Sequence, residues 1–326
     1  MINKKTILWF IGIWIITILI INSGWSEIKN SIMNINPPIL LALALLQLFT
    51  LALTAYQWFF LLSKKSKNLS YLRILLINLS ASFVESVTPS SKLGGEAAKV
   101  YLLRKETSLS YQSLATIVMT HKYFSLLPFI ILCMLALIIS SFSFVLPTIV
   151  YISFLAFFFL FIMIFYIFSK AGSLIDKDSD NKIFNKITGF IVFIQRAISQ
   201  SRKVLAPNEA IFLFLISLLV WILYPVKLYI ISLALGFELS FVFITVVTYT
   251  AYLISILPLT PGGLGTFEGS AAFIFSLNAY LFAEGMAAAL MLRLITFWFP
   301  LILQSIATAY FLSRENINLF SKKQTE

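Results

Sequence analysis

The chain has 326 residues, of which 60% are hydrophobic and only 11% are charged. Soluble domains are about 45–50% apolar and about 25% charged, and a fold of this size cannot hide so much apolar surface from water. This excludes a soluble enzyme, a nucleic-acid-binding domain and a secreted disulfide scaffold, and it predicts an all-α polytopic membrane protein. One cysteine and one histidine leave no classical zinc site, and we expect neither a metal nor a cofactor.

Six stretches are apolar and long enough to cross a bilayer about 30 Å thick as helices. They cover residues 7–25, 38–62, 112–140, 144–168, 210–235 and 285–312. Lys4 and Lys5 precede the first stretch, as in a signal peptide, but no small-residue cleavage site follows it. Trp25 is typical of an interfacial anchor, so the first stretch is predicted to be a span.

The basic residues predict the orientation of these spans. With a cytoplasmic N-terminus, the cytoplasmic segments carry 20 of the 24 Lys and Arg residues, and the outer loops keep only Lys29. Lys and Arg concentrate on the cytoplasmic side of membrane proteins. Both termini are therefore predicted to be cytoplasmic, in a multi-pass protein of the cell membrane.

Two further apolar segments, 74–92 and 241–277, are each interrupted by Pro, Gly and Ser residues. A crossing at either segment would reverse the orientation of everything after it and destroy the charge asymmetry. Both are therefore predicted to be re-entrant hairpins, which leave the membrane on the side they entered. Irregular backbone at membrane depth is tolerated only inside protein or against a water-filled cavity.

Residues 169–209 form the longest predicted cytoplasmic loop. Isoleucines recur at helical spacing opposite basic residues, which predicts an amphipathic helix on the membrane surface. We expect this helix to anchor the chain, with a specific contact to anionic lipid as the alternative.

A shift of 172 residues aligns the two interrupted segments and their neighbouring spans. The features that coincide are Thr88-Pro89 with Thr260-Pro261, Glu96 with Glu268, the span 38–62 with 210–234, and 112–140 with 284–312. This predicts a single transmembrane domain over residues 1–326, with repeat A at about 1–140 and repeat B at about 144–312. Three spans in each half turn the second half upside down, which is a transporter architecture. Coincidence between two Pro/Gly loops is the alternative.

Three runs carry a resemblance to a known family. They are Ser86–Leu103 (SVTPSSKLGGEAAKVYLL), Leu257–Glu268 (LPLTPGGLGTFE) and Leu290–Pro300 (LMLRLITFWFP). They resemble signatures of the transmembrane flippase-like domain of bacterial lysylphosphatidylglycerol synthase and its stand-alone relatives, over nearly the whole chain. The resemblance implies an integral membrane protein that translocates polar lipids or lipid-linked headgroups.

The chain departs from the family pattern at several positions. Ser90 stands where Gly is expected, Lys99 where Arg is common, and His121-Lys122 where Asp-Arg is typical. Lysine keeps the positive charge but loses the bidentate phosphate recognition of arginine. Only 14 residues follow the last predicted span. The chain is therefore expected to lack the aminoacyl-transfer domain and not to make lysyl-lipid by itself.

The candidate substrate-binding residues lie in the interrupted segments and the spans that follow them. They are Lys92, Gly94, Gly95, Glu96, Lys99, Lys122, Thr260, Pro261, Gly262, Gly263, Gly265, Glu268 and Arg293. Ionisable residues at membrane depth are costly and mark functional sites, and glycine turns before helices predicted at 96–105 and from Thr266 offer free N–H groups to an anion. Tight packing turns and a structural Glu268–Arg293 pair are the alternatives.

The leading hypothesis is a transporter of an anionic phospholipid or lipid-linked headgroup, without covalent chemistry or catalytic residues. One alternative is an intramembrane transferase acting on a polyprenyl-phosphate or phospholipid, with Glu96 or Glu268 as base and a divalent metal. The interrupted segments contain no close acidic pair, which disfavours it. The other is a non-catalytic partner of a separate synthase. We expect no nucleic-acid partner, and a homo-oligomer is left open.

The predicted topology is testable by cysteine labelling in a Cys133→Ser background. Cysteines at Ser31 and Leu281 should react with an impermeant thiol reagent added outside the cell. Cysteines at Ser66, Ser179 and Gln324 should react only after permeabilisation, because the predicted hairpins do not cross the membrane. External labelling at Ser179 would contradict both the six spans and the inverted repeat.

Overall fold

The computed structural model describes residues 35–66, 69–88, 93–142, 147–170, 204–256, 260–277 and 280–315, together with Thr17, Lys29, Met33 and Gln200. The described residues form helices and no strands. This confirms the predicted all-α class.

Four helical segments of the described chain are long and apolar enough to cross a membrane, and each matches a predicted span. They are α3 (Pro37–Ser63), α6 (Tyr111–Ser141), α9 (Pro207–Ala234) and the composite segment Phe282–Phe311. The composite segment consists of α12 (Phe282–Arg293), the π-helical turn η3 (Leu294–Trp298) and the first part of α13 (Phe299–Glu315).

The predicted span 144–168 coincides with the helix α7 (Thr148–Lys170), in which Thr148–Leu160 is an apolar stretch shorter than the four segments above. The predicted span 7–25 lies outside the described residues except for Thr17, and so does most of the predicted amphipathic segment 169–209. The total of six spans therefore stays a prediction.

Each interrupted segment forms a helical hairpin. The first consists of α4 (Tyr71–Val87) and α5 (Leu93–Glu106), and the second of α10 (Phe241–Ser255), the 3-10 turn η2 (Pro261–Gly263) and α11 (Thr266–Ser276). In both hairpins the two helices pack against each other. Their re-entrant path through the membrane stays a prediction.

The start of α5 differs from the sequence-based expectation of a helix over 96–105. The helix begins at Leu93, so Gly94 and Gly95 lie in its first turn rather than before it. Packing explains the difference, because a Cβ atom on Gly95 would stand 2.6 Å from Glu85 Cβ on α4. The glycine is therefore needed for close approach of two helices and not for a turn.

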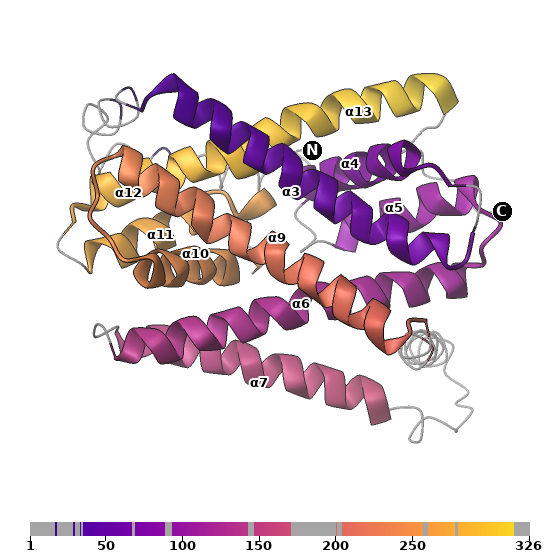
Figure 1. Ribbon diagram of the computed structural model, residues 1–326, viewed down its shortest axis with the longest axis horizontal. Helices are drawn as coiled ribbons and strands as arrows, with labels where there is room; N and C mark the ends of the chain where they lie inside the picture. Colours follow the sequence, from indigo (N-terminus) through magenta and orange to yellow (C-terminus); the bar gives the residue numbers. More distant parts are fainter. Residues whose placement is uncertain are drawn as a thin grey trace, which may run out of the picture.

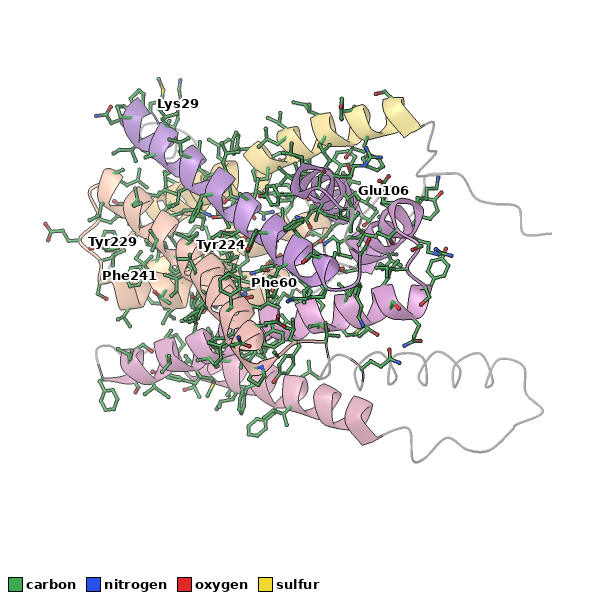
Figure 2. All side chains as sticks on the ribbon, turned by 45° about the vertical axis from the view of Figure 1, so that its right-hand side comes forward. Lys29, Phe60, Glu106, Tyr224, Tyr229 and Phe241 are labelled. Carbon is green, nitrogen blue, oxygen red and sulfur yellow. The ribbon has the colours of Figure 1, made fainter. Side chains whose placement is uncertain are left out.

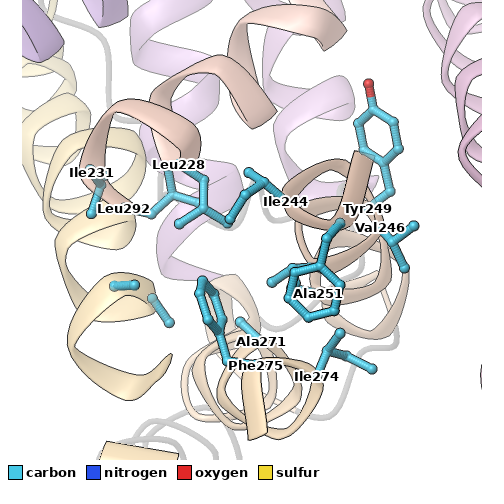
Figure 3. Packing of buried hydrophobic residues seen from close by; sticks show 14 of the residues in the cluster. Leu228, Ile231, Ile244, Val246, Tyr249, Ala251, Ala271, Ile274, Phe275 and Leu292 are labelled. Atoms are coloured by element: carbon cyan, nitrogen blue, oxygen red, sulfur yellow. The ribbon is translucent and has the colours of Figure 1, made fainter. Parts of the chain in front are cut away.

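The helices of the two hairpins lie on opposite sides of the molecule, and α4 of the first contacts the turn η2 of the second. Figure 1 shows α4 and α5 at one end, α10, α11 and α12 at the other, α3 and α9 running between them, and α7 alongside α6. Buried apolar side chains form one large cluster around α9–α12 and a second around the ends of α3, α4, α5 and α6. Figure 3 shows the first cluster, where Phe275 and Ala271 of α11 face Leu228 of α9 and Leu292 of α12.

Polar contacts fix the long helices within this apolar surrounding. Lys227 of α9 is fully buried and donates to Gln47 Oε1 and Thr50 Oγ1 of α3, at 2.6 and 2.8 Å. At the hairpin end, Arg73 of α4 forms an ion pair of 2.6 Å with Glu106 of α5, which Figure 2 labels. Such directional contacts select one register where apolar packing alone is less specific.

The close packing of α5 on α4 gives a stability prediction. Gly95→Ala places a methyl group 2.6 Å from Glu85 Cβ and 3.0 Å from the Ala81 carbonyl oxygen, so the helices must separate. Overpacking of this kind costs about 1–3 kcal/mol, and the melting temperature in detergent should fall. Ala97→Ser adds one atom at an exposed position of the same helix and serves as the control. Equal melting of the two variants would contradict the observed packing.

Candidate functional site

The turn of the second hairpin depends on glycine. Gly262, Gly263 and Gly265 have φ angles of 60°, 70° and 81°, in the region that favours glycine. A Cβ atom on Gly262 would lie 2.4 Å from the Phe297 ring, and one on Gly263 would lie 2.6 Å from Ser255 Cβ. The predicted start of α11 at Thr266 is confirmed.

Arg293 closes this turn. Its Nε donates to Glu268 Oε1 at 3.1 Å and its Nη2 donates to the Gly262 carbonyl at 2.6 Å. The other carboxylate oxygen of Glu268 accepts from the Gly265 backbone N–H at 2.7 Å. Only 6% of the Arg293 side chain and 1% of the Glu268 side chain are exposed. The Glu268 carboxylate thus binds the backbone N–H before α11, where the sequence predicted an external anion. This favours the alternative in which Glu268 and Arg293 form a structural ion pair.

The first hairpin also holds a carboxylate against cations. Lys122 of α6 lies 2.7 Å from Glu96 Oε1 of α5, and Lys99 lies 3.9 Å from the same oxygen. Exposure differs from that of the Arg293 pair, because 12% of the Glu96 side chain and 32% of the Lys122 side chain are exposed. The structure therefore brings together three predicted site residues in a cluster that is open at Lys122.

Aromatic and amide side chains surround this cluster. Lys99 Nζ lies 4.1 Å from the centre of the Trp58 ring, and the ring of His121 lies 4.5 Å from Trp58, centre to centre. His121 Nε2 is 3.1 Å from Gln57 Oε1, and the Gln57 amide nitrogen donates to Ser217 Oγ at 3.0 Å. The cluster is thus built from α3, α5, α6 and α9.

The charge of the cluster follows from these contacts. Glu96 faces both lysines, and Glu85 of α4 also acts on Lys99. Two carboxylates and two lysines therefore meet in this part of the structure.

The remaining predicted site residues divide between the two hairpins. Lys92 lies outside the described residues, and Gly94 lies on α5 beside Gly95. Thr260 and Pro261 belong to the second turn, where the Thr260 hydroxyl donates to the Leu264 carbonyl at 2.8 Å. The two hairpins meet, because α4 of the first hairpin contacts the turn η2 of the second.

Sequence reasoning missed the residues of α3 and α9 in the cluster. Trp58 and Gln57 lie inside an apolar span, and Ser217 lies inside another. Neighbouring polar side chains near the C-terminal end of a span were the available signal for Gln57 and Trp58. The single Ser217 gave none, because small hydroxyl residues are common in apolar helices.

The apolar helices and the buried charged cluster define a polytopic α-helical membrane protein. Its sequence matches the family described as the lysylphosphatidylglycerol synthase TM region over residues 9–303, and the chain belongs to this family. A UPF0104 membrane protein of Methanothermobacter thermautotrophicus is 26% identical over 98% of this chain and 99% of its own length. One of Methanocaldococcus jannaschii is 24% identical over 94% of each chain. One of Pyrococcus horikoshii is 23% identical over 93% of this chain and 96% of its own.

The closed Arg293 network predicts a characteristic double-mutant result. Arg293→Gln and Glu268→Gln should each lower stability by about 3–5 kcal/mol, because each leaves the other charge buried and unpaired. Glutamine at 268 still offers an oxygen to Gly265 N–H, so its effect reports the charge. The double variant should melt at a higher temperature than either single variant in detergent.

Glu238→Gln is the control for this series, because it removes an exposed carboxylate from the same half of the chain. It should melt like the unmodified protein. Additive losses in the double variant would contradict a structural Glu268–Arg293 pair.

Proposed function

We propose that the protein moves a polar lipid with an anionic headgroup, or a lipid-linked headgroup, across the cell membrane without covalent chemistry. The observation that carries the proposal is the cluster of Glu96, Lys99 and Lys122. It places two lysines against a carboxylate of an interrupted hairpin and is exposed at Lys122. Charged groups buried in a membrane protein are expensive and are retained where they serve a ligand or ion pathway.

Membership of the family supports the membrane location that this proposal requires, but it does not identify the lipid that is moved. The relatives that cover the whole chain are membrane proteins by name. A family name that refers to a lipid synthase's membrane region makes lipid the first substrate class to test.

The proposal includes the inverted repeat and cytoplasmic termini. Each hairpin carries a glutamate in the first turn of its second helix, and each glutamate pairs with a cation of the next long helix. The two partners are 25 residues apart for Glu268 and Arg293, and one residue further apart for Glu96 and Lys122. Equivalent ion pairs at equivalent positions support two related halves, with the second pair locking its hairpin and the first serving the headgroup.

Reconstitution tests the proposed movement. Proteoliposomes should contain headgroup-labelled anionic and cationic phospholipids and a labelled lipid-linked sugar, and a membrane-impermeant quencher reports transfer between leaflets. Faster transfer of an anionic headgroup without a new lipid product supports the proposal. A chemically modified lipid would identify an intramembrane transferase instead. If neither transfer nor a new lipid product is observed, the result favours a non-catalytic partner of a synthase.

Charge substitution at Lys122 sharpens this test. Lys122→Gln should slow movement of the anionic lipid about tenfold or more, because it removes a charged hydrogen-bond donor from the headgroup. Lys122→Arg keeps the charge and should retain movement. Lys105→Gln removes an exposed lysine from the same hairpin and is the matched control. Transfer at the unmodified rate in Lys122→Gln would remove this cluster from the pathway.

A further inference from the structure

Lys227 of α9 is a buried lysine outside the cluster at the first hairpin. Its amine is fully buried, and its two hydrogen-bond acceptors on α3, Gln47 Oε1 and Thr50 Oγ1, are both neutral oxygens. Among the described residues, no carboxylate forms an ion pair with it. An ammonium buried without a counter-charge is strongly unfavourable, and ionisable residues kept at membrane depth mark ion pathways and proton relays.

The helices packed against α9 supply no counter-charge to Lys227. They are α3, α6, α10 and α12, of which α3 and α10 contain no Asp, Glu, Lys, Arg or His. The charged and imidazole side chains of the other two are His121 and Lys122 on α6, and Glu284 and Arg293 on α12. Lys122 and Arg293 pair with glutamates of the hairpins, and Glu284 accepts from the backbone N–H of Leu281.

Tyr224 connects Lys227 with the first hairpin. Lys227 Nζ lies 4.7 Å from the centre of the Tyr224 ring, one turn earlier on α9 (Figure 2). The carboxylate of Glu85 on α4 acts electrostatically on both Tyr224 and Lys99, and its side chain is partly exposed. The tyrosine thus stands between a fully buried amine and a carboxylate that is open to exchange.

Lys227 also lies beside an interruption in the hydrogen bonds of its own helix. Pro225 is inside α9 and has no N–H, so the Trp221 carbonyl four residues earlier loses its helical donor. The Tyr249 hydroxyl donates to this carbonyl instead, at 3.4 Å. A helix bends most readily at such a proline. The contacts of Lys227 with α3 therefore lie next to the point where α9 can bend.

We propose that Lys227 binds and releases the proton that drives the lipid movement. The inference names the driving ion of the proposed function and rests on that function. Release breaks one N–H bond of Nζ, the electron pair stays on the nitrogen, and the proton passes by way of Glu85 to water. Uptake of a proton from the other side of the membrane restores the ammonium.

The two protonation states differ in how firmly they hold α9 on α3. The neutral amine still has two N–H groups for Gln47 and Thr50, so both acceptors keep a donor. The ammonium makes charge-assisted hydrogen bonds, which are about twice as strong, and it alone is attracted by the face of the Tyr224 ring. Loss of the proton therefore loosens the α3–α9 contact beside Pro225 and couples proton release to bending of α9.

The steady-state distribution of lipid between the leaflets tests this coupling. Proteoliposomes with a headgroup-labelled anionic phospholipid are given a pH difference of one unit, and a potassium ionophore with equal potassium on both sides holds the membrane potential at zero. Coupling to one proton should shift the leaflet ratio up to about tenfold, because one pH unit is tenfold in proton concentration. The ratio should stay unchanged in protein-free liposomes.

Two variants fix the charge at this position in opposite ways. Lys227→Gln keeps N–H donors for the α3 acceptors but cannot titrate, and Gln47→Glu gives the ammonium a counter-charge that retains its proton. Both should lose the pH-driven shift, whereas Gln47→Glu should melt at a higher temperature than the unmodified protein. Lys65→Gln removes an exposed lysine just after α3 and is the matched control. A purely structural Lys227 would leave the pH-driven shift intact in Gln47→Glu.

Proton binding is measurable without lipid movement. In the full chain labelled with 13C-lysine, the Cε resonance that is missing from Lys227→Gln should change with pH while the protein stays folded. A resonance that remains at the ammonium position throughout this range would overturn the inference.

The outcomes distinguish this inference from the proposed function. Absence of lipid movement under every condition, with a titrating Lys227 resonance, would overturn the proposed function and leave the proton site in place. Lipid movement without a pH-driven shift of the leaflet ratio would overturn the coupling alone. An equal shift in Lys227→Gln would assign the proton to another group.

Discussion

The guanidinium of Arg293 is the constraint on which the second hairpin depends. The glycine turn brings the Gly262 carbonyl and the Glu268 carboxylate into the protein interior, where each needs a donor. The rigid guanidinium fork supplies both donors from one side chain. The π-helical turn that follows Arg293 places Phe297 against Gly262 and under the guanidinium, at 4.1 Å from its centre. Packing of α10, α11 and α12 thus converges on a single cation.

The first hairpin also pairs a glutamate with cations of the chain, but one oxygen of this glutamate has no hydrogen-bond partner among the described residues. Lysine is a flexible point charge without a fork, so Lys99 and Lys122 both turn to one oxygen of Glu96 and leave the other oxygen unpaired. The Arg293 network satisfies its carboxylate within the chain, whereas the Glu96 cluster retains unused hydrogen-bonding groups. This asymmetry gives the second hairpin a closed structural pair and the first hairpin a group with unused hydrogen-bonding atoms.

Hydropathy and charge predicted the helical class and the positions of the four long apolar segments, because these depend on local composition. The Glu268–Arg293 contact was also within reach, since an arginine deep in a span demands a partner. The meeting of Trp58, His121 and Gln57 was not, because it depends on the crossing of α3 and α6 and leaves no periodic signal. Gly95 was misread as a turn residue, because local sequence does not reveal how closely α5 approaches α4.

The contacts of Lys227 hold α9 against α3 more firmly than a partly exposed ion pair could. Separating α9 from α3 would strip a fully buried ammonium of both its acceptors, Gln47 and Thr50, and of the Tyr224 ring at 4.7 Å that Figure 2 labels. Separating α5 from α6 would break the Glu96–Lys122 ion pair, the contact of Arg104 with the Tyr111 ring and the apolar cluster that both helices share. The ion pair at the first hairpin is partly exposed, whereas the Lys227 ammonium is buried, so loss of the Lys227 contacts should be the more costly of the two.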